Sequence, residues 1–371
     1  GVRKQAGAAD HLGLNPSVPA TCFPTSSATA CSWDEKLGEA VGEALGEEAA
    51  AQEVAVLLGP GLNIQRSPLC GRDFEYFSED PILAGRMAAA YVRGIQKNGI
   101  SACPKHFAVN SQELRRMASD SVLDERTLRE LYLTGFEIVV KEAKPKTIMT
   151  SYNLINGTYA NENAHLLQDI LRKDWGFDGA VVTDWGGSND HALGVKNGST
   201  LEMPCPGGDS IRELMKAVQD GKISEADVDA RLDEMLELVL STHAAVEKAP
   251  RTFDAAAHHK LARRAAAESI VLLRNEGGIL PLKPNEKLAV IGDFAETPRY
   301  QGAGSSAVNA LQVDTLLDSI KADDSGITFV GYASGFERQG AADAEKLEEA
   351  VALAKKADTV LLCLGLDELR E

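Results

Sequence analysis

Apolar and polar positions form two kinds of stretch along this chain. Short runs rich in β-branched residues are separated by longer stretches whose apolar residues recur at helical spacing. Short apolar runs are typical of buried parallel strands, and the longer stretches are typical of amphipathic helices, so the pattern predicts an α/β fold. In the first part of the chain the predicted strands are residues 54–58, 100–104, 147–151, 180–183 and 200–203.

The helices between these strands begin at recognisable capping residues. The expected N-caps are Ser32, which has the capping-box spacing to Glu35, Asp80 before Pro81, Asp124, and Ser224 with Asp227. The helix after Ser224 is expected to end near Leu240. In the helix after Asp124, the residues expected to face the core are Leu128, Leu131, Phe136 and Val139.

The periodic pattern lapses at residues 241–253, "STHAAVEKAPRTF", which we interpret as a linker. Beyond it the pattern predicts two helices, at 261–269 and 343–356, and four strands, at 270–274, 288–292, 327–330 and 359–364. We therefore expect one α/β domain to about residue 245 and a second from about residue 260. The second domain is expected to be incomplete, because a helix normally follows the last strand of such a sheet.

Composition and charge narrow the class of protein. The 371 residues are 44% hydrophobic and 25% charged, which is typical of a globular protein with a large core. The formal net charge of −17 repels phosphates and anionic lipid, so we expect neither nucleic acid nor membrane as partner. The six cysteines are scattered, which favours a reducing, cytoplasmic location. Secretion stays open, because a leader could have preceded Gly1.

Four predicted strands are followed by polar or aromatic side chains. These are Arg72 near Asp73 and Glu75, Lys105 with His106, Tyr152 with Asn153, and Asp184 with Trp185. In a (β/α)-barrel the carboxyl ends of the strands share one face, where the active site lies. We therefore expect a cleft at this rim.

The residue types at this rim match a neutral, hydroxyl-rich ligand. Carboxylates, lysine, arginine and histidine exchange hydrogen bonds with hydroxyl groups, and tryptophan and tyrosine offer flat apolar faces. A sugar fits this description. Cationic neighbours favour the ionised form of Asp184, which suits a nucleophile that attacks an anomeric carbon.

Each of these residues also has a structural interpretation. Arg72 could form a surface ion pair with Asp73 or Glu75, and His106 could be a core histidine. Tyr152 and Trp185 could fill the core. Asp184 could cap the next helix, although "DWGGSND" also offers Ser188 and Asp190 as caps.

Sequence motifs for cofactors are incomplete. "GPGLNI" and "GAGSS" lack the spacing of a phosphate-binding loop, and "LAVIGDFA" lacks the glycines of a dinucleotide-binding unit. The seven histidines and six cysteines lack metal-ligand spacings, and no Gly-x-Ser-x-Gly motif occurs. We expect neither a metal nor an organic cofactor.

Four segments in order resemble the motifs of glycoside hydrolase family 3, in its β-glucosidase branch. They are "GPGLNIQRSPLCGRDFEYFSEDP", "CPKHFAVNSQE", "MTSYNLING" and "GFDGAVVTDWGG". The resemblance implies a (β/α)8-type barrel followed by an α/β sandwich. On this basis we expect a barrel domain at 1–245 that lacks its first elements, a linker at 246–260 and part of the sandwich at 261–371.

The resemblance also implies roles for individual residues. Asp184 would be the nucleophile of a retaining mechanism. Glu113 would belong to a supporting polar network near Lys105. The residues that would contact the sugar are Arg72, Lys105 and His106 at its hydroxyl groups, and Met149, Tyr152 and Trp185 at its faces.

Two departures from the family pattern affect these expectations, and a third feature argues against the N-acetylglucosaminidase branch. Residues 1–3 resemble those that follow a sugar-binding Asp-Gly-Pro motif, so that aspartate is expected to be absent. The acid/base glutamate, required at about 5–5.5 Å from the nucleophile, is expected beyond Glu371, and Glu371 and Glu368 are poor substitutes. Residues 108–110, Ala-Val-Asn, replace the Pro-Gly-His-Gly stretch of the N-acetylglucosaminidase branch.

The expected function is hydrolysis of terminal, non-reducing β-D-glucosyl or related residues through a covalent glycosyl-enzyme. A sugar-binding protein without turnover, a β-xylosidase or a β-N-acetylglucosaminidase-type hydrolase stay open as alternatives. A nucleotide-binding α/β protein is a further class, which NAD or ATP would stabilise against heat. A complementary chain segment or a second copy could be a partner, because unpaired barrel edges aggregate.

Overall fold

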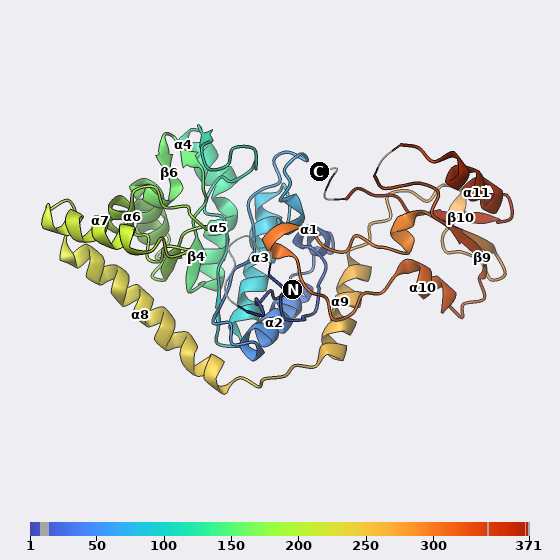
Figure 1. Ribbon diagram of the computed structural model, residues 1–371, viewed down its shortest axis with the longest axis horizontal. Coiled ribbons are helices and arrows are strands. Elements are labelled where there is room, and N and C mark those ends of the chain that lie inside the picture. The colour runs from blue at the N-terminus through green and yellow to red at the C-terminus, as the bar shows by residue number, and fades with distance from the viewer. Residues whose placement is uncertain (8–14, 340, 368, 370–371) are drawn as a thin grey trace. The chain divides into compact units, whose positions relative to one another are not determined.

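The computed structural model describes residues 1–7, 15–339, 341–367 and 369. The chain divides into two units, each of mixed α/β structure (Figure 1). The first unit comprises Gly1–Ile270 with Gly304–Asn309, and the second comprises Val271–Ala303 with Ala310–Glu371. Glu368 and Glu371, which the sequence raised as substitutes for an acid/base residue, lie outside the described residues.

The first unit contains nine α-helices and seven short strands in its described residues. The helices are α1 (Ser26–Ala30), α2 (Glu35–Ala51), α3 (Pro81–Gln96), α4 (Glu125–Thr127), α5 (Thr134–Ile138), α6 (His191–Asn197), α7 (Gly208–Gln219), α8 (Glu225–Lys248) and α9 (Ala255–Glu268). Wider π-type turns occupy Leu128–Tyr132, Val139–Ala143 and His165–Asp174. The strands are β1 (Val56–Leu57), β2 (Ser101–Ala102), β3 (Asp120–Ser121), β4 (Thr147–Met149), β5 (Leu154–Ile155), β6 (Thr158–Tyr159) and β7 (Ala180–Val182).

Parallel pairing joins the strands that the sequence predicted. Strand β1 pairs with β2, and β4 pairs with β7. Isolated parallel bridges extend this pairing, between Gly61 and Lys105, between Phe107 and Thr150, and between Val182 and Leu201. The predicted strand at 200–203 is reduced to the bridge at Leu201. The carboxyl ends of these strands therefore lie next to one another at one edge, as parallel pairing requires.

Most of the predicted helix starts are confirmed. Asp80 accepts hydrogen bonds from the N–H groups at the start of α3, Asp124 caps α4, and Ser224 forms a full capping box with Asp227. The expected cap at Ser32 is wrong. The N-cap of α2 is Asp34, and the hydroxyl of Ser32 donates to Thr29 O instead, at 2.6 Å.

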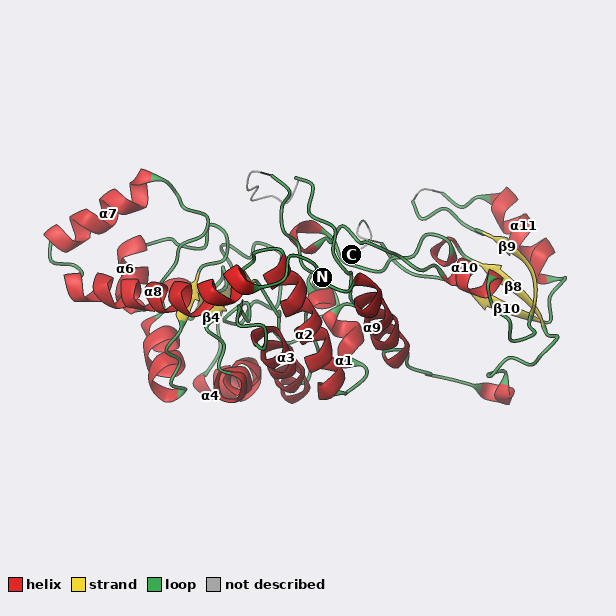
Figure 2. Ribbon diagram, turned by 90° about the horizontal axis from the view of Figure 1, so that it is seen from below, coloured by secondary structure: helices red, strands yellow, loops and turns green. Residues whose placement is uncertain are grey.

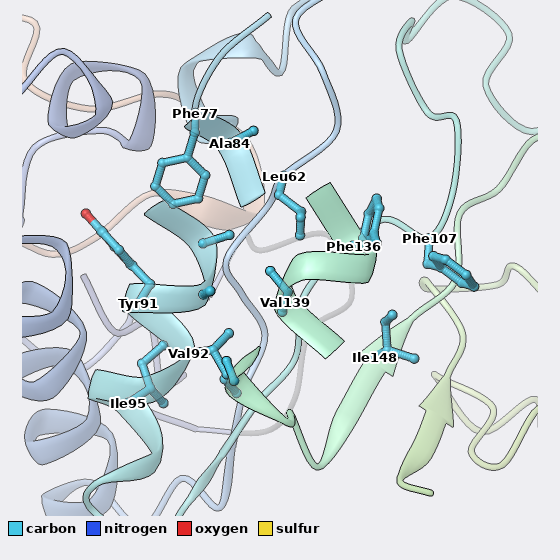
Figure 3. Close-up of a cluster of buried hydrophobic side chains, with 14 of the residues drawn as sticks. Leu62, Phe77, Ala84, Tyr91, Val92, Ile95, Phe107, Phe136, Val139 and Ile148 are labelled. Atoms are coloured by element: carbon cyan, nitrogen blue, oxygen red, sulfur yellow. The ribbon is translucent and has the colours of Figure 1, made fainter. Parts of the chain in front are cut away.

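A hydrophobic cluster holds the helices against the strands. Figure 3 shows part of it, with side chains from α3, α5 and β4 converging. The ring of Phe107 meets Phe136 and Trp175 edge to face, at centroid distances of 5.2 Å and 5.8 Å. Helices α2 and α3 lie side by side in this unit (Figures 1 and 2). A Cβ at Gly42 would collide with the carbonyl oxygen of Tyr91, so this contact requires glycine.

The prediction that Leu131 faces the core is wrong. Leu128, Phe136 and Val139 are buried as expected, but Leu131 is 36% exposed. The wide turn at Leu128–Tyr132 takes up more residues than an α-helical turn. This shift in phase brings Leu133 into the core instead.

The segment expected to link the two domains is partly helical. Helix α8 continues to Lys248, well past the expected end near Leu240, and α9 already begins at Ala255. Residues 241–248 contain no helix-breaking residue, whereas Pro250 restricts Ala249 to an extended conformation. The non-helical connection is therefore confined to residues 249–254. No helix in the described chain has the length and hydropathy to span a membrane.

The second unit is built on a parallel sheet with the order β10-β8-β9 (Figure 2). Its strands are β8 (Lys287–Ile291), β9 (Thr328–Ala333) and β10 (Thr359–Leu362), and its helices are α10 (Leu316–Lys321) and α11 (Ala344–Ala354). Val290 packs with Leu317 of α10, whereas its neighbour Ile291 packs with Ala350 of α11. Because successive side chains of a strand point to opposite faces, the two helices cover opposite faces of the sheet.

The prediction of a strand at residues 270–274 is wrong. These residues belong to no helix or strand, and Ile270 and Leu273 are largely exposed. An apolar run becomes a strand only where another strand completes its hydrogen bonds. This run pairs with none of the described strands.

His258 joins α9 to α2 in the first unit. Its Nδ1 lies 2.8 Å from Oε1 of the fully buried Glu48, and its Nε2 lies 3.2 Å from Oε2 of Glu47. The second oxygen of Glu48 accepts a hydrogen bond from Thr21 N at 3.0 Å. The hydrogen bond to Glu48 is the main cause that raises the pKa of His258 above its ordinary value of 6.5, against the opposing effect of burial. Through these two contacts His258 ties the two helices together.

We expect the stability of the first unit to fall as the pH rises above about 6.5. The contribution of His258 is complete below the pKa of the unfolded state and is lost as the pH passes through the raised pKa of the folded state. Urea unfolding followed by tryptophan fluorescence reports on this unit, because Trp33, Trp175 and Trp185 all lie in it.

His258→Gln is expected to flatten this pH dependence. His243→Gln, which removes an exposed histidine, is the matched control and leaves the slope unchanged. A His258→Gln variant whose unfolding midpoint falls with pH as steeply as that of the unsubstituted chain contradicts the prediction.

Candidate active site

The carboxyl end of β7 places Asp184 at the rim of the parallel strands. Its Oδ1 accepts a hydrogen bond from Trp185 N at 2.8 Å. Its Oδ2 is buried, lies 3.5 Å from Nε2 of His106, and accepts no hydrogen bond from the described residues. The N-cap of α6 is Asp190, which accepts a hydrogen bond from Leu193 N. Asp184 is therefore not a helix cap, and one of its oxygens is free for chemistry.

His106 is buried among polar partners. Its backbone N–H and C=O both bond the side-chain amide of Asn63, at 2.8 Å and 2.9 Å. Its Nδ1 lies 3.1 Å from the hydroxyl of Tyr76. Burial, with the nearby charges of Arg72 and Lys105, lowers the pKa of His106 well below 6.5. The imidazole is therefore neutral at physiological pH.

Glu75 binds two cations of the site at once. Its Oε1 forms a short ion pair with Nε of Arg72, and its Oε2 lies 3.6 Å from Nζ of Lys105. Burial acts to raise the pKa of Glu75, but Lys105 and Arg72 together outweigh it and lower that pKa. For Arg72 burial acts to lower the pKa, and Glu75 together with Tyr76 and Glu113 outweighs this effect and raises it. The pairing of Arg72 with Glu75 is thus not an exposed surface contact.

Near Asp184, Tyr152 contacts two neighbours, Trp185 and Arg116. The hydroxyl of Tyr152 donates to Trp185 O at 2.9 Å, and Arg116 Cζ lies 4.7 Å from the centroid of the Tyr152 ring. Burial and then the charge of Asp184 raise the pKa of Tyr152. Trp185 packs against a small apolar cluster that contains Met149. Tyr152 thus contacts both the guanidinium group of Arg116 and the backbone of Trp185.

Glu113 forms an ion pair with Arg116. The Arg116 Nη1 to Glu113 Oε2 distance is 2.7 Å, and Asn110 Nδ2 approaches the other oxygen at 3.4 Å. Glu113 therefore supports the site through Arg116, whereas Glu75 is the carboxylate next to Lys105.

The loop after Asp184 is held at several points. Gly186, with a φ of +78°, donates its N–H to Met203 O at 2.7 Å. Farther along, Oε1 of the buried Glu162 accepts hydrogen bonds from Asn189 N and Asp190 N, at 2.9 Å and 3.3 Å. Burial raises the pKa of Glu162 despite these donors. The loop therefore has a fixed path.

Several residues of this site are not marked by any of the sequence patterns described above. They are Asn63, Tyr76, Arg116 and Glu162. Tyr76 follows Glu75 in the quoted segment "GRDFEYFSEDP", but its hydroxyl reaches His106 only after the chain folds. Within the described residues, no three side chains able to bind metal converge.

Comparison with protein families identifies the class of protein. The profile described as "Glycosyl hydrolase family 3 N terminal domain" matches residues 10–238. The profile described as "Glycosyl hydrolase family 3 C-terminal domain" matches residues 270–371. The chain belongs to glycosyl hydrolase family 3, which confirms the resemblance of its motifs.

Characterised relatives match along the whole chain. "Thermostable beta-glucosidase B" of Acetivibrio thermocellus is 45% identical over 371 residues, which are 99% of this chain and 49% of that protein. "Exo-alpha-(1->6)-L-arabinopyranosidase" of Bifidobacterium longum is 45% identical over 382 residues, which cover 100% of this chain and 50% of that protein. The chain therefore spans about half the length of these relatives.

Solved structures of the family have a similar fold. A family 3 beta-glucosidase of Bifidobacterium adolescentis is 44% identical, with a TM-score of 0.90, covering 97% of this chain and 52% of that one. Beta-glucosidase 3B of Thermotoga neapolitana, solved in complex with alpha-D-glucose, is 37% identical with a TM-score of 0.82. That match covers 96% of this chain and 48% of the Thermotoga chain.

Replacing Glu75 tests whether the two cations depend on it. Glu75→Gln leaves Arg72 and Lys105 without their shared anion in a largely buried site, so we expect the free energy of unfolding to fall by about 3–5 kcal/mol. Urea unfolding followed by tryptophan fluorescence measures this change. Glu130→Gln, at an exposed ion pair with Arg126, is the matched control and is expected to change the midpoint little. Equal midpoints for the two variants contradict the prediction.

Proposed function

We propose that this protein hydrolyses terminal, non-reducing β-D-glucosyl residues of β-glucosides and oligosaccharides through a covalent glycosyl-enzyme. The observation that carries the proposal is the position of Asp184, whose buried Oδ2 has no hydrogen-bond donor among the described residues and lies beside neutral His106. An oxygen whose lone pairs are free, held at the end of a strand, is suited to attack an anomeric carbon. The names of the relatives support the substrate class.

The proposed fold is a (β/α)8-type barrel followed by an α/β sandwich. Five consecutive parallel segments, from β1 to the bridge at Leu201, support the barrel. The parallel sheet with helices on both faces supports the sandwich. The expected ranges are 1–245 for the barrel, 246–260 for the linker and 261–371 for the sandwich. We propose that the sandwich begins after α9, because α9 (Ala255–Glu268) lies wholly within the first unit.

The proposed roles follow from the contacts within the site. Arg72, Lys105 and His106 would bond the hydroxyl groups of the sugar, and their positions next to Glu75 and Asp184 support this assignment. Met149, Tyr152 and Trp185 would contact the faces of the sugar. Glu113 would position Arg116, which lies over the Tyr152 ring.

The chemistry begins with attack of Asp184 Oδ2 on the anomeric carbon, which forms the C–O bond of the glycosyl-enzyme as the bond to the aglycone breaks. A proton donor protonates the departing aglycone oxygen. Water then attacks the same carbon as its bond to Asp184 Oδ2 breaks, the proton of the water passes to the deprotonated donor, and Asp184 returns to a carboxylate. Asp184 Oδ1 keeps its hydrogen bond to Trp185 N, which orients the carboxylate. A fixed carboxylate lowers the entropic cost of reaching the attack geometry.

One comparison favours a second substrate. The arabinopyranosidase of Bifidobacterium longum matches this chain with the same 45% identity as the beta-glucosidase of Acetivibrio thermocellus. Hydrolysis of an α-L-arabinopyranoside is therefore the second candidate function. The ratio of kcat/KM for nitrophenyl β-D-glucopyranoside and nitrophenyl α-L-arabinopyranoside decides between the two.

Trapping the covalent intermediate tests the nucleophile. We expect 2,4-dinitrophenyl 2-deoxy-2-fluoro-β-D-glucopyranoside to label the chain at Asp184, because its leaving group needs little protonation. Mass spectrometry of the peptides locates the label. Asp184→Asn is expected to abolish labelling, whereas Asp190→Asn, a change at the cap of α6, preserves it. A label on another carboxylate, or no label on a folded chain, contradicts the proposal.

A further inference from the structure

Tyr76 and His106 form a fully buried pair within the proposed site. Tyr76 is 0% exposed and His106 is 1% exposed. The rings meet nearly at right angles, with centroids 6.1 Å apart, and the Tyr76 hydroxyl lies 3.1 Å from Nδ1. The other ring nitrogen, Nε2, lies 3.5 Å from Asp184 Oδ2. The imidazole therefore stands between a phenol and the proposed nucleophile.

The neutral imidazole of His106 carries one N–H, either on Nδ1 or on Nε2. With the proton on Nδ1, the lone pair of Nε2 would face the carboxylate of Asp184, which is electrostatically unfavourable. The Tyr76 hydroxyl would then act as acceptor, and its own proton would lack a partner. In the described part of the chain, Nδ1 is the acceptor within hydrogen-bond distance of that hydroxyl. A buried donor without an acceptor is costly.

With the proton on Nε2 both conflicts disappear. The Tyr76 hydroxyl donates to the lone pair of Nδ1, and Nε2–H points its positive end toward the carboxylate. Both neighbours of the imidazole therefore select the same tautomer. The pKa of His106, lowered by burial and by Arg72 and Lys105, keeps the ring neutral, so the choice of tautomer matters at physiological pH. Burial also raises the pKa of Tyr76 well above 10, so its hydroxyl remains a donor.

We propose that Tyr76 is a positioning residue that fixes His106 as the Nε2–H tautomer and thereby presents an N–H group to Asp184. An effect of this tautomer on catalysis rests on the proposed function of Asp184 as the nucleophile. At 3.5 Å the N–H stabilises the carboxylate through its dipole without occupying a lone pair in a short hydrogen bond. The opposite tautomer would place a lone pair there and remove the N–H that a sugar hydroxyl or the carboxylate could use.

The tautomer can be read directly from the nitrogen resonances of the imidazole. We would label the full chain with ¹⁵N-histidine and record long-range ¹H–¹⁵N spectra. His106→Gln removes one of the seven histidine signals and so assigns His106. The unsubstituted chain is expected to show a protonated Nε2 and an unprotonated Nδ1. A protonated Nδ1 overturns the proposal.

Two further variants separate the effect of Tyr76 from that of Asp184. In Asp184→Asn the carboxylate charge is gone, and Tyr76 alone is expected to keep His106 in the Nε2–H form. In the double variant Asp184→Asn with Tyr76→Phe, we expect a mixture of the two tautomers. A pure Nε2–H signal in the double variant overturns the proposal, because the tautomer would then not depend on Tyr76.

A kinetic measurement links the tautomer to the nucleophile. Tyr76→Phe is expected to slow labelling of Asp184 by the fluoroglucoside at saturating probe, with little change in probe affinity. Tyr91→Phe, which removes another buried tyrosine hydroxyl, is the matched control and keeps the labelling rate. Equal rates for both variants contradict the positioning role. Failure of the unsubstituted chain to label would refute the proposed function, while the nitrogen spectra would still decide the tautomer.

Discussion

The hydrogen bonds between Phe107 N and Met149 O, at 2.7 Å, and between Thr150 N and Val182 O, at 2.9 Å, join three parallel segments of the first unit. Because the pairing is parallel, all three chains leave the sheet at the same edge. His106, Tyr152 and Asp184 are therefore brought together by backbone bonding, although about 80 residues separate the first from the last. A shift of one residue in this register would turn each side chain to the opposite face.

The same segments supply both the core and the site, since neighbouring residues of a strand point in opposite directions. Phe107 enters the aromatic cluster with Phe136 and Trp175, while His106 faces Tyr76 and Asp184 (Figure 3 shows the Phe107 side). Packing on one face thus fixes the polar groups on the other. This arrangement lets a buried histidine hold its orientation without a short hydrogen bond to the carboxylate beside it.

Charge balance is the second condition for the site. Arg72 and Lys105 lie in a largely buried region, and Glu75 forms an ion pair with each of them. Asp184 is left outside that pairing, so its Oδ2 keeps its lone pairs. Glu75 pairs with the cations and Asp184 does not, so the site holds two cations beside a carboxylate oxygen that accepts no hydrogen bond from the described residues. The chain that carries this arrangement of charges belongs to glycosyl hydrolase family 3, a family named for the hydrolysis of glycosides.

The sequence by itself determined the element types, most helix caps and the residues at the strand ends. These features depend on neighbours within a few positions, such as Asp80 with Ile82 N or Ser224 with Asp227. Local patterns misplaced Leu131, whose exposure depends on a wide helical turn, and the run 270–274, which lacks a partner strand. Only the tertiary structure decided that Glu75 lies next to Lys105 and that Glu113 pairs with Arg116. It alone decided that Tyr76 reaches His106, because contacts between residues 30 positions apart depend on strand register and core packing, which no local pattern encodes.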